Sequence, residues 1–202
     1  AHAPMRSAPS VGGLPAYAEL RCLSNFSFLR GASRPEELVE RAKALGYSAL
    51  AITDECSMAG VVRAHVAAKE AGLPLLIGAQ FSINRQASHH GPACTLVVLA
   101  QNLHGYGNLC AFITRLRRSS EKGSYRVDLE DITGSALAEC LALACPERGA
   151  SDGDLEHLGR WALKQFTGRC WIGVEQVRQL DDELWLHRMR ELLSCSSRFR
   201  PS

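Results

Sequence analysis

An acidic pair, Asp54-Glu55, is the most suggestive chemical feature of the sequence, because it directly follows the apolar run at residues 49–52. In parallel α/β proteins, functional side chains gather at the carboxyl ends of the strands. Carboxylates at such a position bind divalent metals or exchange protons. They also cap a following helix or brace a loop through hydrogen bonds. The residues alone leave both interpretations open.

Polar side chains follow other predicted strands too, namely Arg21 to Ser24, Gln80, Gln101 and Glu175. A metal centre commonly adds histidines to carboxylates. None of the seven histidines lies at a predicted strand end: they are His2, His65, His89, His90, His104, His157 and His187. His89-His90 falls in a polar loop, where two ligands alone make a poor site. The residues therefore predict a weak, incomplete site, without a nucleophilic triad.

Short apolar runs alternate with helical patterns, and these elements must position the polar side chains. The patterns predict strands at residues 18–22, 49–52, 75–77, 95–100, 141–144 and 170–174, and helices at 33–45, 57–71, 103–118, 154–166 and 182–193. Ser33 and Glu36 fit a capping box for the first helix. Strand–helix alternation predicts crossover connections and a parallel sheet, either a (β/α) barrel or a doubly wound sheet. The Gly-rich phosphate fingerprint of many doubly wound proteins is absent.

Composition limits the classes of protein. With 202 residues, 46% of them hydrophobic, and a formal net charge of only +2, the chain fits one globular domain without a bulk electrostatic attraction for nucleic acid. Its eight cysteines stand singly, which favours buried free thiols in a reducing cytosol. No apolar run is long enough to span a bilayer. We expect a flexible leader at residues 1–16, a domain at 17–193 and an irregular tail at 194–202.

Five segments carry a family resemblance in the right order and spacing: Tyr17–Ser33, Pro35–Ala42, Ala49–His65, Ile77–Phe81 and Leu99–Leu109. They resemble the N-terminal PHP domain of bacterial error-prone DNA polymerases related to the polymerase III alpha subunit. The resemblance implies a distorted (β/α) barrel of about seven strand–helix units. Six units are recognisable here, so we expect the C-terminal part of the barrel to be missing. An unpaired barrel edge would favour self-association.

Active members of this family hold a metal cluster and hydrolyse phosphoester bonds. The resemblance implies a His-x-His motif at Arg21 and Leu23, and further ligands at Asp54, Glu55, Gln80 and Thr95. Only Asp54 keeps its identity. Arginine cannot bind a metal and leucine has no lone pair. We therefore predict no bound metal and no catalytic residue, but a cleft in which Arg21 pairs with Asp54 or Glu55; its residues are Arg21, Asp54, Glu55, Gln80 and Glu175.

The resemblance implies that the full-length protein is a cytoplasmic, Mg²⁺-dependent DNA polymerase acting in damage-induced mutagenesis, whose catalytic carboxylates lie far downstream. For this chain we expect a structural role against the polymerase core. Two alternatives remain. One is an active, metal-dependent PHP phosphoesterase or proofreading nuclease. The other is a docking module for the sliding clamp or for mutagenesis accessory proteins.

Overall fold

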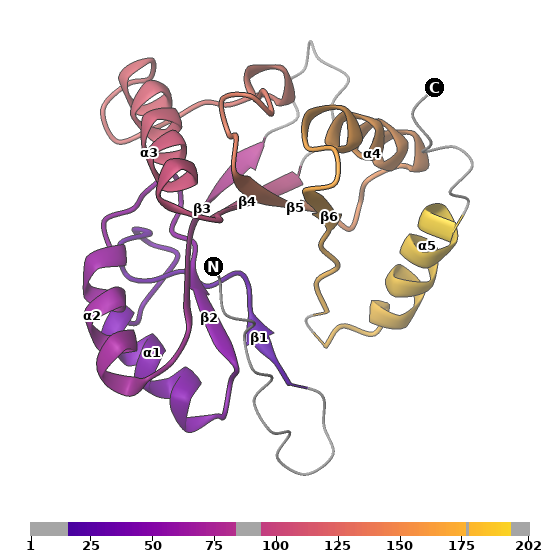
Figure 1. The fold of residues 1–202 in the computed structure, drawn as a ribbon. Helices are drawn as coiled ribbons and strands as arrows, with labels where there is room; N and C mark the ends of the chain where they lie inside the picture. The colour runs from indigo at the N-terminus through magenta and orange to yellow at the C-terminus, as the bar shows by residue number, and fades with distance from the viewer. Residues whose placement is uncertain (1–15, 84–93, 177, 195–202) are drawn as a thin grey trace. The chain divides into compact units, whose positions relative to one another are not determined.

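The computed structural model divides the chain into two compact units, Ala1–Ala79 and Gln80–Ser202. It describes residues 16–83, 94–176 and 178–194 (Figure 1). The predicted leader, the His89-His90 loop and the tail beyond residue 194 therefore lie outside the described residues, apart from residue 16. Six strands follow one another in the mixed sheet in the order β1 to β6, and β3 contributes residues to both units.

The first unit is built on parallel strands. β1 (Ala18–Glu19) pairs with β2 (Ala49–Ile52), and β2 pairs with the start of β3 (Leu75–Ile83). The connections are the helices α1 (Pro35–Ala44) and α2 (Val61–Ala71), which pack against each other beside β2 (Figure 1). The strand–helix alternation predicted for this unit is confirmed.

Both helices of the first unit begin later than the sequence pattern indicates. The backbone N–H of Arg34 donates to Glu37 Oε2 at 2.7 Å, so the predicted Ser33–Glu36 capping box is wrong by one residue. Pro35 explains the shift, because a residue before proline favours the extended conformation of an N-cap, which Arg34 adopts. α2 begins at Val61 instead of Ser57 and ends at Ala71, as predicted, with Gly72 as its C-cap in the left-handed conformation.

Apolar residues facing inward from α1, α2 and β2 form the core of the first unit. Its fully buried members are Val39, Ala42, Leu50, Ile52, Ala64, Ala68 and Leu73. Small alanines on both helices allow close helix packing, while branched side chains come from β2 and also from α1, at Val39, and from the residue after the α2 C-cap, Leu73. This core fixes the position of the residues that follow β2.

The second unit contains an antiparallel strand pair, which the sequence interpretation missed. Its elements are β4 (Cys94–Ala100), α3 (Leu103–Arg118), the 3₁₀ helix η2 (Leu129–Asp131), β5 (Cys140–Pro146), α4 (Asp152–Gln165), β6 (Cys170–Ile172) and α5 (Asp182–Ser194). β5 and β6 are parallel, but β4 and β5 are antiparallel, with Ala100 opposite Cys140. The predicted all-parallel sheet is therefore wrong at this pair.

The return path after α3 explains the reversal. The chain leaves β4 at Gln101, runs through α3 and residues 119–139, and comes back to the same strand end. There the Gln101 N–H donates to the Glu139 carbonyl at 3.1 Å. A connection that returns to the end it left produces an antiparallel pair even though it contains a helix.

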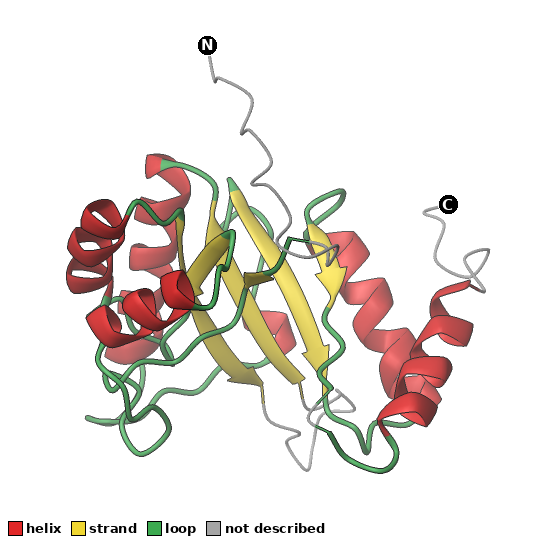
Figure 2. Cartoon of the chain, turned by 90° about the horizontal axis from the view of Figure 1, so that it is seen from below, coloured by secondary structure: helices red, strands yellow, loops and turns green. Residues whose placement is uncertain are grey.

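Aromatic rings fill the interior of the second unit. Phe81 is fully buried and meets Phe112 edge-to-face, with ring centroids 5.2 Å apart. Tyr125 approaches the same ring at 6.4 Å, and its hydroxyl accepts a hydrogen bond from the Ser82 N–H. Figure 2 distinguishes the helices, strands and loops of the described chain by colour.

Strand lengths differ from the predictions in both directions. β1 covers two residues instead of five, and β3 continues from the predicted end at Ile77 to Ile83. β6 ends at Ile172, two residues early. In contrast, α3 matches its predicted bounds, and Asn102 caps it by accepting from the Gly105 N–H at 3.0 Å.

The cysteines of the described segments carry free thiols, as predicted: they are Cys22, Cys56, Cys94, Cys110, Cys140, Cys145 and Cys170. Cys195 lies outside those segments. Among the helices in the described part of the chain, none combines the length and the apolar character needed to cross a lipid bilayer.

Candidate functional site

Asp54 follows β2 directly and is almost fully buried, with 1% of its surface exposed. Its Oδ1 accepts hydrogen bonds from the Ser24 N–H at 2.8 Å and from Ser27 Oγ at 2.7 Å. Its Oδ2 accepts a hydrogen bond from Ser24 Oγ at 2.7 Å. Three donors therefore hold this buried carboxylate in place, as the desolvation of a polar group requires.

The segment between β1 and α1 supplies these donors because it folds into tight turns. The Ser27 N–H donates to the Ser24 carbonyl at 2.9 Å, and the Gly31 N–H donates to the Ser27 carbonyl at 2.9 Å. A Cβ on Gly31 would stand 1.9 Å from the Ser24 carbonyl oxygen, so only glycine fits there. The turns bring both hydroxyls to the same carboxylate.

Gly60 closes the other side of Asp54. A Cβ on Gly60 would lie 2.8 Å from Asp54 Oδ2 and 3.0 Å from Ser24 Oγ. Gly60 is also the N-cap residue of α2, so the carboxylate lies beside a helix N-terminus. The helix dipole favours a negative charge at this position.

Glu55 has an arginine partner, but a different one from the residue that we expected. Arg30 Nη1 and Glu55 Oε2 lie 2.6 Å apart, and the Glu55 N–H donates to Ser27 Oγ at 2.9 Å. The side chain of Glu55 is 14% exposed, against 43% for Arg30. The cation that the structure places beside the acidic pair is thus Arg30. A pairing of Arg21 with either carboxylate stays a prediction.

The other residues of the predicted site lie on several elements. Arg21 and Leu23 are half-buried just beyond β1, and the Arg21 N–H donates to Glu19 Oε1 at 3.0 Å. In the second unit, Gln80 is fully buried within β3, while Thr95 is half-buried on β4, opposite Cys145. Of the predicted set, Asp54 and Glu55 therefore stand together after β2 with Arg30 beside Glu55, while Gln80 and Thr95 belong to the second unit.

Glu175 and Gln101 complete the predicted strand-end residues, and both are exposed. The backbone carbonyl of Glu175 accepts a hydrogen bond from Arg148 at 3.2 Å. Arg148 also forms ion pairs with Asp181 and Asp182 at the start of α5. This end of the second unit is consequently organised around an arginine rather than around a group of carboxylates.

Ser27 is a residue that the sequence interpretation missed, and Ser24, which it placed after the first predicted strand, has a role that it did not predict. Both are buried, with exposed fractions of 0% and 2%, although serine is usually exposed. The Ser-x-x-Ser spacing is a usable signal, because hydroxyls at such spacing stabilise local turns. Here the Phe26 N–H donates to Ser24 Oγ at 3.2 Å.

The thiol of Cys22 lies next to this cluster, and burial raises its pKa to about 11, with smaller contributions from the charges of Glu19 and Asp54. A thiol with so high a pKa carries almost no thiolate at neutral pH. Cys22 is therefore a packing residue. Its backbone joins the two strand ends, since its carbonyl accepts from the Thr53 N–H at 2.8 Å.

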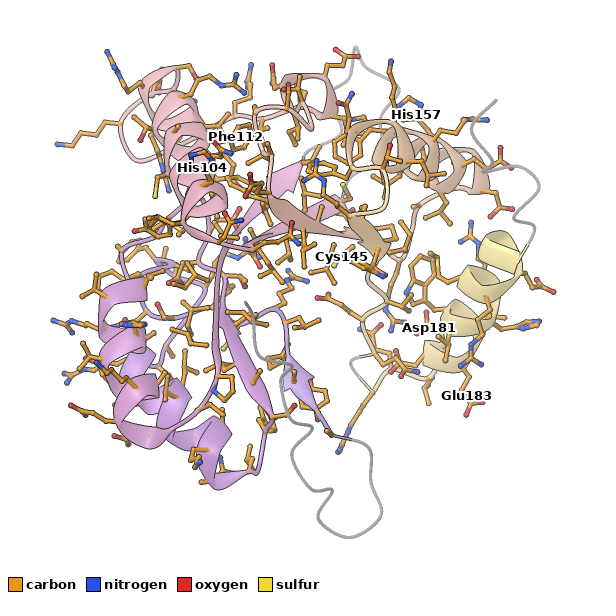
Figure 3. The ribbon with its side chains drawn as sticks, in the orientation of Figure 1. His104, Phe112, Cys145, His157, Asp181 and Glu183 are labelled. Carbon is orange, nitrogen blue, oxygen red and sulfur yellow. The ribbon has the colours of Figure 1, made fainter. Side chains whose placement is uncertain are left out.

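Four histidines lie within the described residues, and of these only His65 belongs to the first unit. His65 and His187 are exposed on α2 and α5. His104 on α3 and His157 on α4 are exposed as well (Figure 3). His104 Nδ1 lies 3.8 Å from Glu139 Oε1. The hydrogen bonds described for Asp54 come from Ser24 and Ser27.

The donors around Asp54 do not fit a metal cluster. Two metals in close proximity need several anionic or imidazole ligands, whereas both oxygens of Asp54 accept hydrogen bonds from serines. Within residues 16–83, 94–176 and 178–194, no three His, Cys, Asp or Glu side chains gather in a group suited to a metal ion. The arrangement can brace the loop between β1 and α1.

Comparison with known proteins identifies the family. The PHP domain model matches residues 19–184, and the chain therefore belongs to the PHP domain family. It is 55% identical over 166 residues to an error-prone DNA polymerase of Dechloromonas aromatica, covering 80% of this chain and 15% of that protein. The corresponding polymerase of Bordetella parapertussis is 49% identical over 179 residues, or 85% of this chain and 17% of the relative.

The polymerase of Pseudomonas aeruginosa, 46% identical over 187 residues, is matched over 93% of this chain and 17% of its own length. The chain thus spans about a sixth of the length of these relatives. The predicted resemblance to error-prone polymerases is confirmed.

Solved structures confirm the predicted fold class. An amidohydrolase from Chromobacterium violaceum, determined with bound sulfate and no metal, superposes with a TM-score of 0.67 at 18% identity, over 90% of this chain and 84% of that chain. A protein from Bifidobacterium adolescentis, named as a metal-dependent phosphoesterase, superposes with a TM-score of 0.62 at 16% identity. The match covers 92% of this chain and 85% of that chain. At these identities the likeness concerns the α/β fold alone.

Proposed function

We propose that this chain is the N-terminal PHP domain of an error-prone DNA polymerase and that it serves as a structural domain with a degenerate metal site. Identities of 46 to 55% to error-prone polymerases support the first part. The full-length protein would be a cytoplasmic nucleotidyltransferase that copies damaged DNA during repair, with Mg²⁺ bound far from this domain.

The observation that carries the structural role is the buried contact between Asp54 and two serines. Asp54 is the one expected ligand that is retained, and its oxygens are engaged in bracing a loop. Arg21, Leu23, Gln80 and Thr95 occupy the other expected ligand positions. An arginine, an aliphatic side chain and two neutral polar side chains do not neutralise a cluster of divalent cations.

Calorimetric titration of the chain with Zn²⁺ and with Mn²⁺ tests the degenerate site. We expect no binding at micromolar concentrations, and the same heats for wild type and Asp54→Asn. Submicromolar binding that disappears in Asp54→Asn would overturn the proposal. A metal-dependent phosphatase or nuclease activity lost in the same variant would instead establish the active phosphoesterase.

A primer-extension assay tests whether nucleotide incorporation depends on parts of the polymerase outside this chain. We expect incorporation by the full-length polymerase with Mg²⁺ and none by this chain, because nucleotide addition needs carboxylate-bound metals that we place outside it. The remainder of the polymerase is the proposed principal partner. Pull-down with the sliding clamp and with mutagenesis accessory proteins, and light scattering for self-association through a sheet edge, test the other partners.

A further inference from the structure

Three exposed apolar side chains lie within four residues of one another in the segment that Asp54 braces. Phe28 is 84% exposed and Leu29 is 89% exposed, while Phe26 is 39% exposed. We call these three residues the apolar tip. Ser27 lies between them in sequence and points the other way, buried at 2% exposure against Asp54. Exposed apolar side chains that stand together mark interaction sites.

The apolar tip is held rigidly. The Arg30 and Gly31 N–H groups both donate to the Ser27 carbonyl, at 3.0 and 2.9 Å. Leu29 adopts φ = 61°, a left-handed conformation that costs a branched residue about 1 kcal/mol or more. Such strain persists where the surroundings over-determine it. The turn therefore holds the backbone at Phe28 and Leu29 in a defined conformation, which reduces the backbone entropy lost when a partner binds.

The charge around the apolar tip is balanced, which favours an apolar partner over nucleic acid. Residues 16–79 contain seven basic and seven acidic side chains. Arg30 pairs with Glu55, and Arg63, whose guanidinium lies 5.9 Å from the Phe26 ring centroid, approaches Glu36 at 3.7 Å. Affinity for nucleic acid depends mainly on unbalanced positive charge.

The size of the apolar tip restricts the partner further. One large aromatic side chain buries about 150–250 Å², so three apolar side chains bury far less than the roughly 1,200–2,000 Å² of a stable interface between free proteins. A second copy of the chain would not be held by so small a surface. A partner joined covalently to the domain is different, because a tether supplies an effective concentration of about a millimolar.

We infer that the apolar tip docks into an apolar pocket in the remainder of the same polymerase polypeptide. This inference rests on the proposed function. The chain spans only 15 to 17% of its polymerase relatives, so each of them carries more than four times as much further polypeptide. The hydrogen-bonded Asp54 cluster then has a purpose: it fixes the segment that makes the contact.

Hydrogen exchange on the isolated chain and on the full-length polymerase tests this inference without a mutation. We expect amide exchange at residues 26–30 to be several-fold slower in the full-length protein. Equal exchange rates at these residues in the two proteins would overturn the inference. Primer extension by the same full-length sample tests the proposed function separately. If the polymerase were active but amide exchange at the apolar tip were not slowed, the docking inference would be refuted while the proposed function would stand.

The double variant Phe28→Ser/Leu29→Asn tests the side chains, with asparagine chosen because it tolerates positive φ. In the full-length protein we expect the unfolding midpoint to fall by about 3 °C, and in the isolated chain we expect no drop. Leu103→Ser, at an 84% exposed position on α3, is the matched control. It should leave the unfolding midpoint of both proteins unchanged. A drop in the isolated chain, or no drop in the full-length protein, would contradict docking.

Discussion

The chain stabilises two neighbouring parallel strands by opposite means. After β2, a buried carboxylate at Asp54 collects three hydrogen bonds from two serines. Within β3, Phe81 is equally buried but packs against the rings of Phe112 and Tyr125. Hydrogen bonds depend on each atom and its direction, whereas ring packing depends on volume and shape. The two regions should therefore respond differently to the same kinds of substitution.

Removing the Phe81 ring should have the largest effect. Phe81→Ala leaves a cavity among buried rings, and we expect the free energy of unfolding to fall by about 4 kcal/mol. Phe81→Leu should lower the free energy of unfolding much less, because leucine retains most of the buried volume. Urea unfolding followed by circular dichroism measures both. Phe28→Ala, at an 84% exposed ring, is the control and should change stability little; equal losses at positions 28 and 81 would contradict the packing argument.

Asp54→Ala should have the next largest effect. We expect the free energy of unfolding to fall by about 3 kcal/mol, because three donors lose their acceptor in a buried site. Asp54→Asn conserves the volume yet removes the charge and one acceptor, so its stability should lie between those of wild type and Asp54→Ala. This sensitivity to chemistry at constant volume is what separates Asp54 from Phe81. If Asp54→Asn were as stable as wild type, the charge would contribute nothing.

The sequence predicted the order of elements well because apolar periodicity is local. β2 and α3 match the predicted bounds, since a run of four apolar residues and an uninterrupted helical pattern each define one element. Strand direction is not local. The antiparallel pairing of β4 with β5 depends on where residues 119–139 return the chain, and no periodic pattern encodes that path.

The candidate site was predicted only in its acidic half. Asp54 and Glu55 follow an apolar run, which makes them visible in a sequence. Ser24 and Ser27 are distant in sequence, and serine side chains are usually solvated, so their burial against Asp54 emerges only from the fold. The choice of Arg30 as the partner of Glu55 depends likewise on the turn at residues 27–31.

Ser27→Ala should lower the free energy of unfolding by about 2 kcal/mol. This is less than the loss expected for Asp54→Ala, because the Ser24 donors remain. Ser27 Oγ donates to Asp54 and accepts from the Glu55 N–H, so alanine leaves that buried N–H without its acceptor. Ser135→Ala, at an exposed hydroxyl, is the control and should stay within about 0.5 kcal/mol of wild type. A neutral Ser27→Ala would mean that Ser24 alone braces the carboxylate.

Alkaline pH should lower the stability of the apolar interior of the second unit through its buried thiols. This effect should be the smallest of those predicted. Burial raises the pKa of Cys94 from 9.0 to about 12, with a smaller contribution from Cys145. Above pH 9 the unfolded chain loses this proton while the folded chain keeps it, so the stabilisation is complete below pH 9 and declines as pH rises toward 12. At pH 10 the thiol alone should lower the free energy of unfolding by about 1 kcal/mol.

Comparing wild type with Cys94→Ala at pH 7.5 and pH 10 isolates this contribution, because other titrating groups are common to both proteins. The variant loses some packing at both pH values, but its stability should fall less between them than that of wild type. Ser27→Ala should show the same fall as wild type, since it removes no thiol. An identical pH dependence in Cys94→Ala and wild type would show that the thiol ionises equally in the folded and unfolded chains, and burial on β4 would then not raise its pKa.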